Sequence, residues 1–274
     1  MIDAHCHVWS ADLARYPLVA GREAQALQPP AYPLESHLAR LKTHGIGRAV
    51  LVQHVHFHGF DIRYLVDARR HFPDRVAVIG ACGESESDAP VRLRAQIDAG
   101  VRGVRLRGID TASWAGSTTM QSLWAMATEA ELALCVLACN PGMDVDGLLH
   151  LDALCVAHPR AIVVIDHMGL AMPGDRAQSE RLIALARHPG VHLKLSAFDK
   201  FVSAPPATLR RQLRSILTAF GAERLMWGSD LPVLETSGAT CLQDAIDVVR
   251  TIPGISGASL DAIFGKTAAR LFFD

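Results

Sequence analysis

The sequence predicts an α/β fold of the (β/α)8 barrel class, as a single domain over residues 1–274 with an additional C-terminal helix. Short apolar runs of strand length alternate with segments of helical periodicity along the whole chain. There are eight such runs, which is the number expected of a barrel of about 250 residues. The runs are continuous in Val, Ile and Leu, as is typical of parallel strands covered on both faces.

The first strand leads into His7, Val8 and Trp9, and each later strand is followed by a segment with an apolar stripe. A doubly wound open sheet is the competing architecture, but it usually carries a glycine-rich turn after its first strand. Residues 260–273 are expected to form the additional helix, closing over the outside of the barrel. The strands are expected at residues 2–7, 49–53, 76–81, 103–106, 133–138, 162–165, 191–195 and 225–227. Examples of the stripes are Leu34, Leu38 and Leu41, then Leu209, Leu213, Ile216 and Phe220, then Leu242, Ile246 and Val249.

Composition and charge argue against several classes of partner. The formal net charge is −1 and the basic residues are scattered, so the chain lacks the one-sided positive surface that nucleic acid requires. Met1 leads directly into a strand pattern without a secretory signal, and no run of about 18 apolar residues suggests a membrane span. We therefore expect a cytoplasmic protein with no nucleic acid or membrane partner. Its six cysteines are expected to be reduced.

Four polar side chains that follow apolar runs form the candidate site. His5 and His7 end the first strand, His167 follows the sixth, and Asp230 follows the eighth. Residues two apart on a strand point to the same side, and the carboxyl ends of barrel strands surround the active-site mouth. We expect three imidazoles and one carboxylate to meet there, as metal ligands or as groups that polarise a carbonyl. The alternative is a chance His-X-His pair.

Several motifs resemble the amidohydrolase superfamily, and within it the branch of 2-pyrone-4,6-dicarboxylate lactonase and the fucono- and rhamnonolactonases. The resemblance runs from residue 2 to about residue 273, with its motifs in the expected order. It implies a hydrolase acting on the carboxylic ester bond of a lactone. The motifs are Asp-Ala-His-Cys-His-Val-Trp at 3–9, Gly-Val-Arg-Leu at 103–106, Val-Ile-Asp-His-Met-Gly at 164–169, Leu-Lys-Leu-Ser at 193–196 and Trp-Gly-Ser-Asp-Leu-Pro at 227–232.

The chain departs from the binuclear members of this superfamily. Those members bridge two metals with a carboxylated lysine or a glutamate on strand four and place a further histidine on strand five. Here strand four offers Arg105 and Arg107, and strand five offers Cys135, Cys139 and Asn140 on the strand or just after it. A two-metal site is therefore not expected.

One divalent metal ion, zinc or manganese, would suit the donor atoms of His5, His7, His167 and Asp230. Some lactonases of this branch work without a metal, and the histidines then polarise the carbonyl directly. Both versions stay open. In each, Asp230 deprotonates a water that attacks the ester carbonyl, while the imidazoles or the metal stabilise the oxyanion. The tetrahedral intermediate then collapses with ring opening.

Two basic residues are candidate contacts to an anionic substrate. Arg105 matches an arginine that binds a substrate carboxylate in the branch, and Lys200 aligns with another such position. A second arginine of the dicarboxylate enzymes has no counterpart in the segment 109–111. A monocarboxylate or a polyhydroxylated sugar lactone is therefore favoured over a dicarboxylate. The alternative is that Arg105 and Lys200 pair with acidic side chains of the protein.

Three further side chains are candidate substrate contacts. Gln53 ends strand two, where its amide can reach substrate hydroxyls. Lys194 needs a partner if it faces inward, because an unpaired buried ammonium is costly. That partner is the substrate, Asp230 or a structural ion pair. Trp9 is expected to form a wall of the pocket.

The remaining polar residues near these motifs have less certain roles. The cluster His54, His56 and His58 stays open between a substrate rim, an accidental metal site and a solvent-facing loop. Asp3 and Asp166 are expected to face outward and to cap loops.

Two alternatives to the lactonase remain in view. A metal-dependent decarboxylase of an aromatic or muconate acid shares the fold and the strand-eight aspartate, but it usually retains the strand-five histidine that is missing here. A non-catalytic binding barrel is the third hypothesis, and the presence of all four candidate site residues argues against it.

Overall fold

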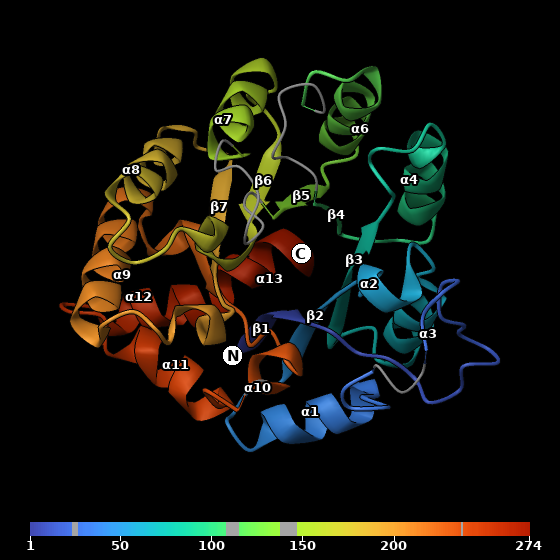
Figure 1. The fold of residues 1–274 in the computed structure, drawn as a ribbon, viewed down its shortest axis with the longest axis horizontal. Coiled ribbons are helices and arrows are strands. Elements are labelled where there is room, and N and C mark those ends of the chain that lie inside the picture. The colour runs from blue at the N-terminus through green and yellow to red at the C-terminus, as the bar shows by residue number, and fades with distance from the viewer. Residues whose placement is uncertain (24–26, 108–114, 138–146, 237) are drawn as a thin grey trace.

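Eight parallel strands follow one another around a nearly closed barrel, and the predicted fold class is confirmed (Figure 1). The computed structural model describes residues 1–23, 27–107, 115–137, 147–236 and 238–274. Neighbours in the sheet are also neighbours in the sequence, as in a simple βα repeat. The strands are β1 (Ile2–Cys6), β2 (Arg48–Val52), β3 (Val76–Ala81), β4 (Gly103–Leu106), β5 (Ala133–Val136), β6 (Ile162–Ile165), β7 (Val191–Leu195) and β8 (Leu225–Trp227).

Most of the helices form a ring outside the strands (Figure 1). Some begin at the caps that their sequences encode: Ser117 Oγ accepts the backbone N–H of Met120, and Asp175 accepts that of Gln178. The α-helices are α1 (Leu34–Lys42), α2 (Val55–His58), α3 (Arg63–His71), α4 (Ala89–Asp98), α6 (Thr118–Glu129), α7 (Gly147–Ala157), α8 (Arg176–Ala184), α9 (Pro206–Phe220), α10 (Val233–Thr236), α11 (Leu242–Arg250), α12 (Gly257–Asp261) and α13 (Thr267–Phe272).

The predicted strands agree with the observed ones at five positions, and the other three differ at their ends. The first strand stops at Cys6, the second runs from Arg48 to Val52, and the fifth stops at Val136. In all three the chain leaves the ladder earlier than predicted at the carboxyl end. Hydrophobic runs cannot mark this point, because the backbone turns away there to build the mouth of the barrel.

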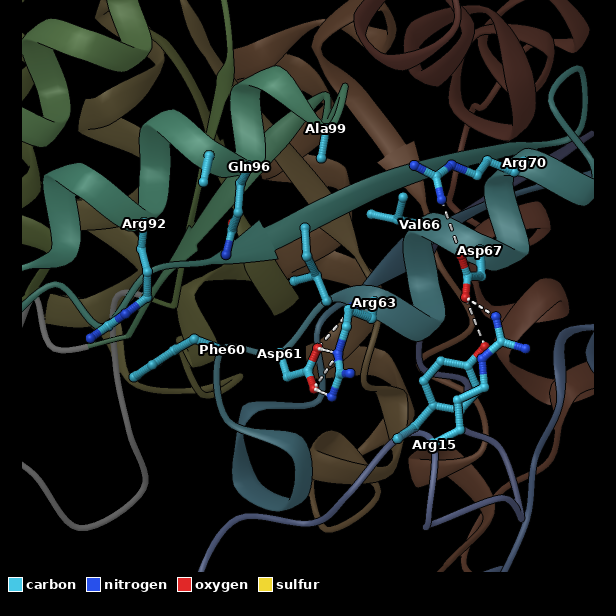
Figure 2. A pocket seen from close by; sticks show the side chains of 13 residues that line it. Arg15, Phe60, Asp61, Arg63, Val66, Asp67, Arg70, Arg92, Gln96 and Ala99 are labelled. Atoms are coloured by element: carbon cyan, nitrogen blue, oxygen red, sulfur yellow. Dashed lines mark hydrogen bonds and ion pairs between the residues drawn. The ribbon is translucent and has the colours of Figure 1, made fainter.

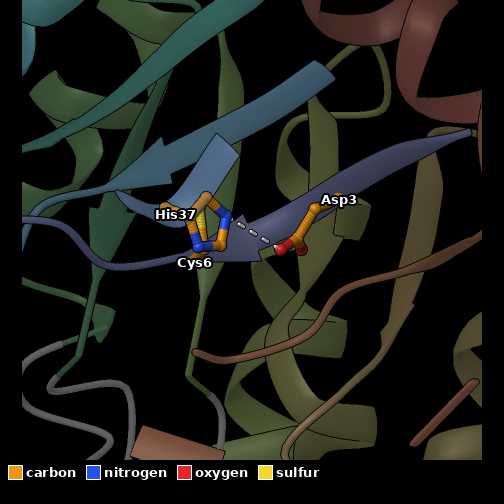
Figure 3. A group of neighbouring side chains, drawn as sticks. All are labelled: Asp3, Cys6 and His37. Carbon is orange, nitrogen blue, oxygen red and sulfur yellow. Dashed lines mark ion pairs between the residues drawn. The ribbon is translucent and has the colours of Figure 1, made fainter. Parts of the chain in front are cut away.

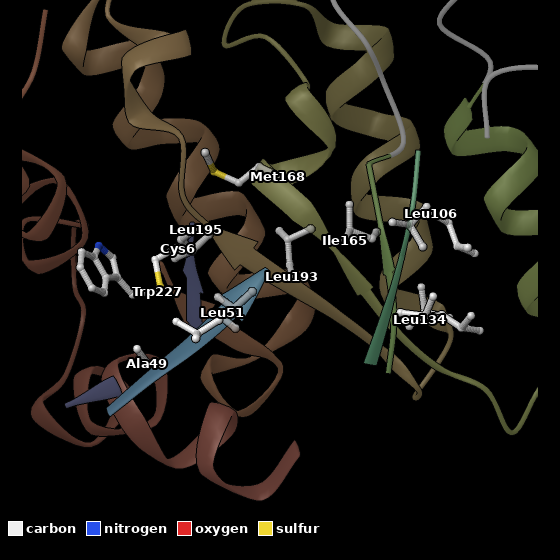
Figure 4. Close-up of a cluster of buried hydrophobic side chains, with 14 of the residues drawn as sticks. Cys6, Ala49, Leu51, Leu106, Leu134, Ile165, Met168, Leu193, Leu195 and Trp227 are labelled. Carbon is white, nitrogen blue, oxygen red and sulfur yellow. The ribbon is translucent and has the colours of Figure 1, made fainter. Parts of the chain in front are cut away.

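The apolar core has two parts. The outer part lies between the strands and the helix ring, and Figure 4 shows Leu51, Leu134, Leu193 and Trp227 within it. The inner part fills the barrel on the side where the strands begin. Its side chains alternate along each strand with those of the outer part. Its strand residues are Ile2, Ala4, Val50, Val52, Ala77, Ile79, Ala133, Cys135, Val164 and Met226.

The additional C-terminal helix is present, but its position corrects the expectation that it lies over the outside. Ala268 and Phe272 of α13 are buried against the inner core, and Figure 1 shows α13 within the ring of helices. The helix therefore plugs the end of the barrel where the strands begin. It takes this place because the apolar inner core would otherwise be open to water there.

Two other expectations concern cysteines and membranes. The five cysteines among the described residues are free, and four of them are buried. No helix within the described ranges has both the length and the apolar character needed to cross a bilayer.

Candidate active site

A bulge in β1 decides which way the first histidines point. Asp3 pairs with Ala49, but Cys6 pairs with Leu51, so β1 has one residue more than β2 over this stretch. The extra residue shifts the alternation of side chains. As a result Ala4 packs in the inner core, His5 contacts the residues that line the mouth, and Asp3 faces outward as predicted.

Asp230 lies on a tight turn between β8 and α10. Its φ of 58° is in the left-handed region, which Asp tolerates better than most residues. The Asp230 Oδ1 atom lies 3.6 Å from His5 Nε2 and 3.5 Å from His7 Nε2. His7 Nδ1 lies 2.8 Å from the carbonyl oxygen of Val52, so in the neutral ring Nδ1 carries the proton and Nε2 has a free lone pair.

The end of β6 brings two neighbouring residues to the same site. Asp166 faces inward because it continues the alternation from Val164, and this corrects the expectation that it faces outward. His167 then takes a left-handed conformation with φ of 54°. That turn moves its ring to the mouth, where its centroid is 4.5 Å from that of His5. Treating His167 as the last strand residue placed Asp166 on the wrong face.

Asp166 is the anion at the centre of a buried polar network. Its Oδ1 atom is 3.0 Å from Lys194 Nζ and 3.3 Å from His5 Nδ1, and its Oδ2 atom is 3.2 Å from Arg105 Nε. Lys194 thus faces inward, and of the three partners considered for it the structure shows a structural ion pair, with Asp166. Lys194 Nζ also lies 3.2 Å from His5 Nδ1. The network therefore fixes the orientation of His5 from below.

Burial and the surrounding charges set the protonation states of His5, His167 and Asp230 at neutral pH. Burial and the charge of Lys194 hold the pKa of His5 well below its usual value, and burial lowers the pKa of His167 to about 4. Burial alone would raise the pKa of Asp230, but His167 and the contact with His7 outweigh it and lower that pKa. His5 and His167 are therefore neutral and Asp230 is ionised.

These shifts predict the pH dependence of any reaction in which His167 takes part. A lowered imidazole pKa keeps His167 neutral until the pH falls to about 4, where protonation removes the acceptor that Nε2 offers to Arg105 Nη2. We expect kcat/KM to stay level from about pH 7 to about pH 5 and to fall below that. Initial rates across this range, corrected for enzyme stability, measure it. A midpoint near the ordinary histidine pKa of about 6.5 would contradict the assignment.

An open cavity of about 230 Å³ lies above this network. A second cavity of about 390 Å³ lies next to it, and the two share His54, Lys200 and Val233 in their walls. Arg105 and Lys200 both line the first cavity and both have acidic partners, Lys200 through Asp199 Oδ2 at 2.5 Å. Arg105 and Lys200 are therefore both paired with acidic side chains of the protein, which was the alternative to a role in substrate binding. Each of them still lines the cavity.

Trp9 and Gln53 lie beside the first cavity and do not line it. Trp9 borders the second cavity, as expected of a pocket wall. Gln53 differs from its prediction, because its Nε2 donates to the carbonyl oxygens of Gly59 and Asp61 at 2.8 and 3.1 Å. Its amide nitrogen thus holds the loop after β2 in place. The sequence could not show this, since the loop conformation creates both acceptors.

His54 and Arg107 also line the first cavity and were not among the predicted site residues. The ring of His54 stacks on Trp9 with centroids 4.9 Å apart and lies 5.2 Å from the ring of His7. Burial, and after it the proximity of His7, lowers the pKa of His54 to about 2, so the ring is neutral. The unusual run of histidines at 54, 56 and 58 was the sequence feature that could have pointed to His54 as a residue of the site. Arg107, one position beyond β4, was noted only as a departure from the metal ligands.

A cavity of about 490 Å³ on the outside of the barrel is a poor alternative site. Figure 2 shows it between residues of α3 and α4, with arginines at its rim that are held by ion pairs. Arg63 pairs with Asp61 and Arg15 pairs with Asp67. These guanidinium groups are neutralised at the surface, and the lining contains neither a histidine nor a cysteine. The mouth of the barrel is therefore the better candidate site.

The donor atoms of the mouth fit one divalent metal ion. Ligand atoms of His5, His7 and Asp230 lie within 4.8 Å of one another, and His5 Nε2 is buried without a hydrogen-bond partner. His167 belongs to a second such group, with His5 and Asp166, so the predicted set of four divides into two overlapping groups. Cys139 and Asn140 lie outside the described residues.

The fold and this centre define a (β/α)8 barrel protein with a histidine and aspartate site at the carboxyl ends of its strands. Residues 2–273 match the model of the amidohydrolase family. The chain belongs to the amidohydrolase family. This confirms the resemblance that the motifs indicated.

Three known proteins illustrate the relationship. The L-fucono-1,5-lactonase of Burkholderia ambifaria is 31% identical over 253 residues, which cover 86% of this chain and 82% of that protein. A structure named as a 2-pyrone-4,6-dicarboxylic acid hydrolase, from Pseudomonas putida, has a TM-score of 0.79 and 27% identity over 98% of this chain and 96% of its own. An amidohydrolase of Burkholderia multivorans with bound zinc has a TM-score of 0.75 and 23% identity, covering 98% of each chain, and it shares the fold.

Proposed function

We propose that this protein is a lactonase that opens the ring of a sugar lactone or of a carboxylated lactone by hydrolysis. The observation that carries the proposal is the position of the Asp230 carboxylate, which lies beside His5 Nε2 and His7 Nε2 and lines a cavity that is also lined by cationic side chains. The 31% identity to an L-fucono-1,5-lactonase supports the same reaction class.

In the proposed reaction, Asp230 accepts a proton from water as the water oxygen bonds to the lactone carbonyl carbon. The carbonyl oxygen becomes an oxyanion and needs donors. Lys194 can only donate, so its contact makes His5 Nδ1 an acceptor and leaves the ring proton on Nε2, which faces the site. The ring C–O bond then breaks, and the leaving oxygen takes the proton back from Asp230. The product is a hydroxy acid.

The site also suits a version with a metal. His5, His7 and Asp230 would hold the ion, which supplies positive charge that polarises the carbonyl. His5 would then carry its proton on Nδ1 and donate it to Asp166 Oδ1, 3.3 Å away. Asp166 and Lys194 thus give His5 a partner in either tautomer.

A lactone screen tests the proposal. Proton release is followed with a pH indicator for L-fucono-1,5-lactone, other aldonolactones, muconolactone and 2-pyrone-4,6-dicarboxylate. Each assay is run on protein as purified, after chelation and with added zinc, beside a measurement of metal content. We expect hydrolysis of at least one lactone. Release of carbon dioxide without any lactone hydrolysis would favour the decarboxylase, and no reaction with any compound would favour a binding protein.

Lys200 is expected to select for negative charge on the lactone. The K200M substitution removes an ammonium that lines both cavities and is expected to raise KM for carboxylated lactones about tenfold, which corresponds to about 1.4 kcal/mol. KM for neutral sugar lactones should be unchanged. The control is K266M, which removes an exposed lysine paired with Asp261. Equal effects on charged and neutral lactones would contradict this role.

A further inference from the structure

Asp3 lies outside the cavity but contacts the turn that carries Asp230. Its carboxylate is fully buried. Oδ1 accepts the backbone N–H groups of His5 and Ser229 at 3.1 and 2.8 Å, and Oδ2 accepts the hydroxyl of Ser229 at 2.5 Å. The first strand and the turn after the last strand are therefore joined through one side chain.

Ser229 extends this connection to the far side of Asp230. Its Oγ atom accepts the backbone N–H of Leu231 at 3.0 Å. Asp230 N–H donates to the carbonyl oxygen of His5, and His7 N–H donates to that of Leu231, each at 2.8 Å. The backbone on both sides of Asp230 is thus fixed to His5 of β1 and to His7, which directly follows that strand.

We propose that Asp3 and Ser229 are positioning residues that hold the left-handed turn at Asp230 and so keep its carboxylate beside His5 and His7. The inference rests on the proposed function, in which Asp230 is the base. A φ of 58° is unfavourable for a residue with a side chain, and it persists where the surroundings impose it. Asp3 and Ser229 supply those surroundings. Without them the turn relaxes and the carboxylate leaves its place.

On the outward side of β1, a histidine of α1 contacts the Asp3 carboxylate. Figure 3 shows His37 of α1 facing Asp3, with Nε2 of His37 3.3 Å from Asp3 Oδ2. The other ring nitrogen, Nδ1, lies 3.1 Å from the hydroxyl of Tyr32. Cys6 completes a group whose donor atoms could suit a metal, but the Asp3 oxygens already accept three hydrogen bonds and the Cys6 thiol donates to the carbonyl oxygen of Val50. His37 therefore braces Asp3, and Cys6 packs beside the pair without a hydrogen bond to it.

The S229A variant tests the inference, because it removes the hydroxyl and leaves the backbone in place. We expect kcat on the best lactone of the screen to fall by on the order of tenfold to a hundredfold, as misplacement of a catalytic group does. KM should stay within about twofold of wild type. Hydrogen exchange at the amides of Asp230 and Leu231 should become faster, and this second measurement requires no substrate.

The control is C6A, which removes a buried atom from the same strand and touches no hydrogen bond of Asp3. It should lower stability and keep kcat. If S229A does not fold, S229C keeps a weaker donor of similar size. If S229A keeps the wild-type kcat and the wild-type hydrogen exchange while D230N is inactive, the positioning role of Asp3 and Ser229 is wrong and the role of Asp230 stands. An active D230N would instead overturn the proposed role of Asp230.

Discussion

D230N is expected to lower kcat at least about a hundredfold, which is within the range that general-base catalysis contributes. The amide has the shape of the carboxylate but cannot accept the proton of the attacking water. It also removes the negative charge that lies 3.5–3.6 Å from the Nε2 atoms of His5 and His7. The two rings then lose the charged group that lies beside both of them.

Steady-state kinetics on the best lactone, with circular dichroism and thermal melting, measure this result. The fold should be retained, because Asp230 is held mainly through its backbone. The matched control is D175N, the same chemical change at the exposed cap of α8, and it should keep the wild-type kcat. A D230N rate within about fivefold of wild type would remove Asp230 from the mechanism.

D166N is expected to lower the free energy of unfolding by about 3–5 kcal/mol, the cost of breaking a buried ion pair by removing one partner. Lys194 Nζ and Arg105 Nε, at 3.0 and 3.2 Å from the carboxylate, would remain buried without a counter-charge. Urea unfolding followed by circular dichroism gives the value. Activity should fall as well, because His5 loses its support.

A double-mutant cycle separates charge from shape in this network. K194M keeps a long apolar side chain near the ring of Phe272, which lies 5.9 Å from Lys194 Nζ. The double variant D166N/K194M should be less destabilised than the sum of the single variants, because it removes both charges together. D152N is the surface control. It affects a carboxylate paired with Arg187 and His188 and should cost about 1 kcal/mol or less. Equal losses for D166N and D152N would contradict the buried network.

Residue periodicity was sufficient to predict the barrel. Continuous apolar runs mark strands buried on both faces, and stripes between them mark the helices of the outer layer. The same pattern placed His5, His7, His167 and Asp230 at the carboxyl ends of strands, and in a barrel those ends converge. The meeting of these four side chains followed from topology and required no knowledge of side-chain contacts.

Only the tertiary structure decided which way the neighbouring side chains face. The bulge in β1 lets Ala4 and His5 both point inward, and the left-handed turn after Asp166 brings two consecutive residues to the mouth. A rule of strict alternation fails at both places, because strand register and backbone irregularities arise from pairing with other strands. For this reason the sequence predicts the wrong face for Asp166 and predicts only an ordinary loop cap at Asp3.

Contacts between distant segments were the other part that sequence could not supply. The positions of Gln53 and His54 depend on the conformation of one loop, and α13 packs against a core that residues of several distant strands form together. The sequence by itself therefore determined the architecture and the chemical groups of the site. The tertiary structure decided their orientation, partners and protonation states, because these depend on burial and on neighbours remote in the chain.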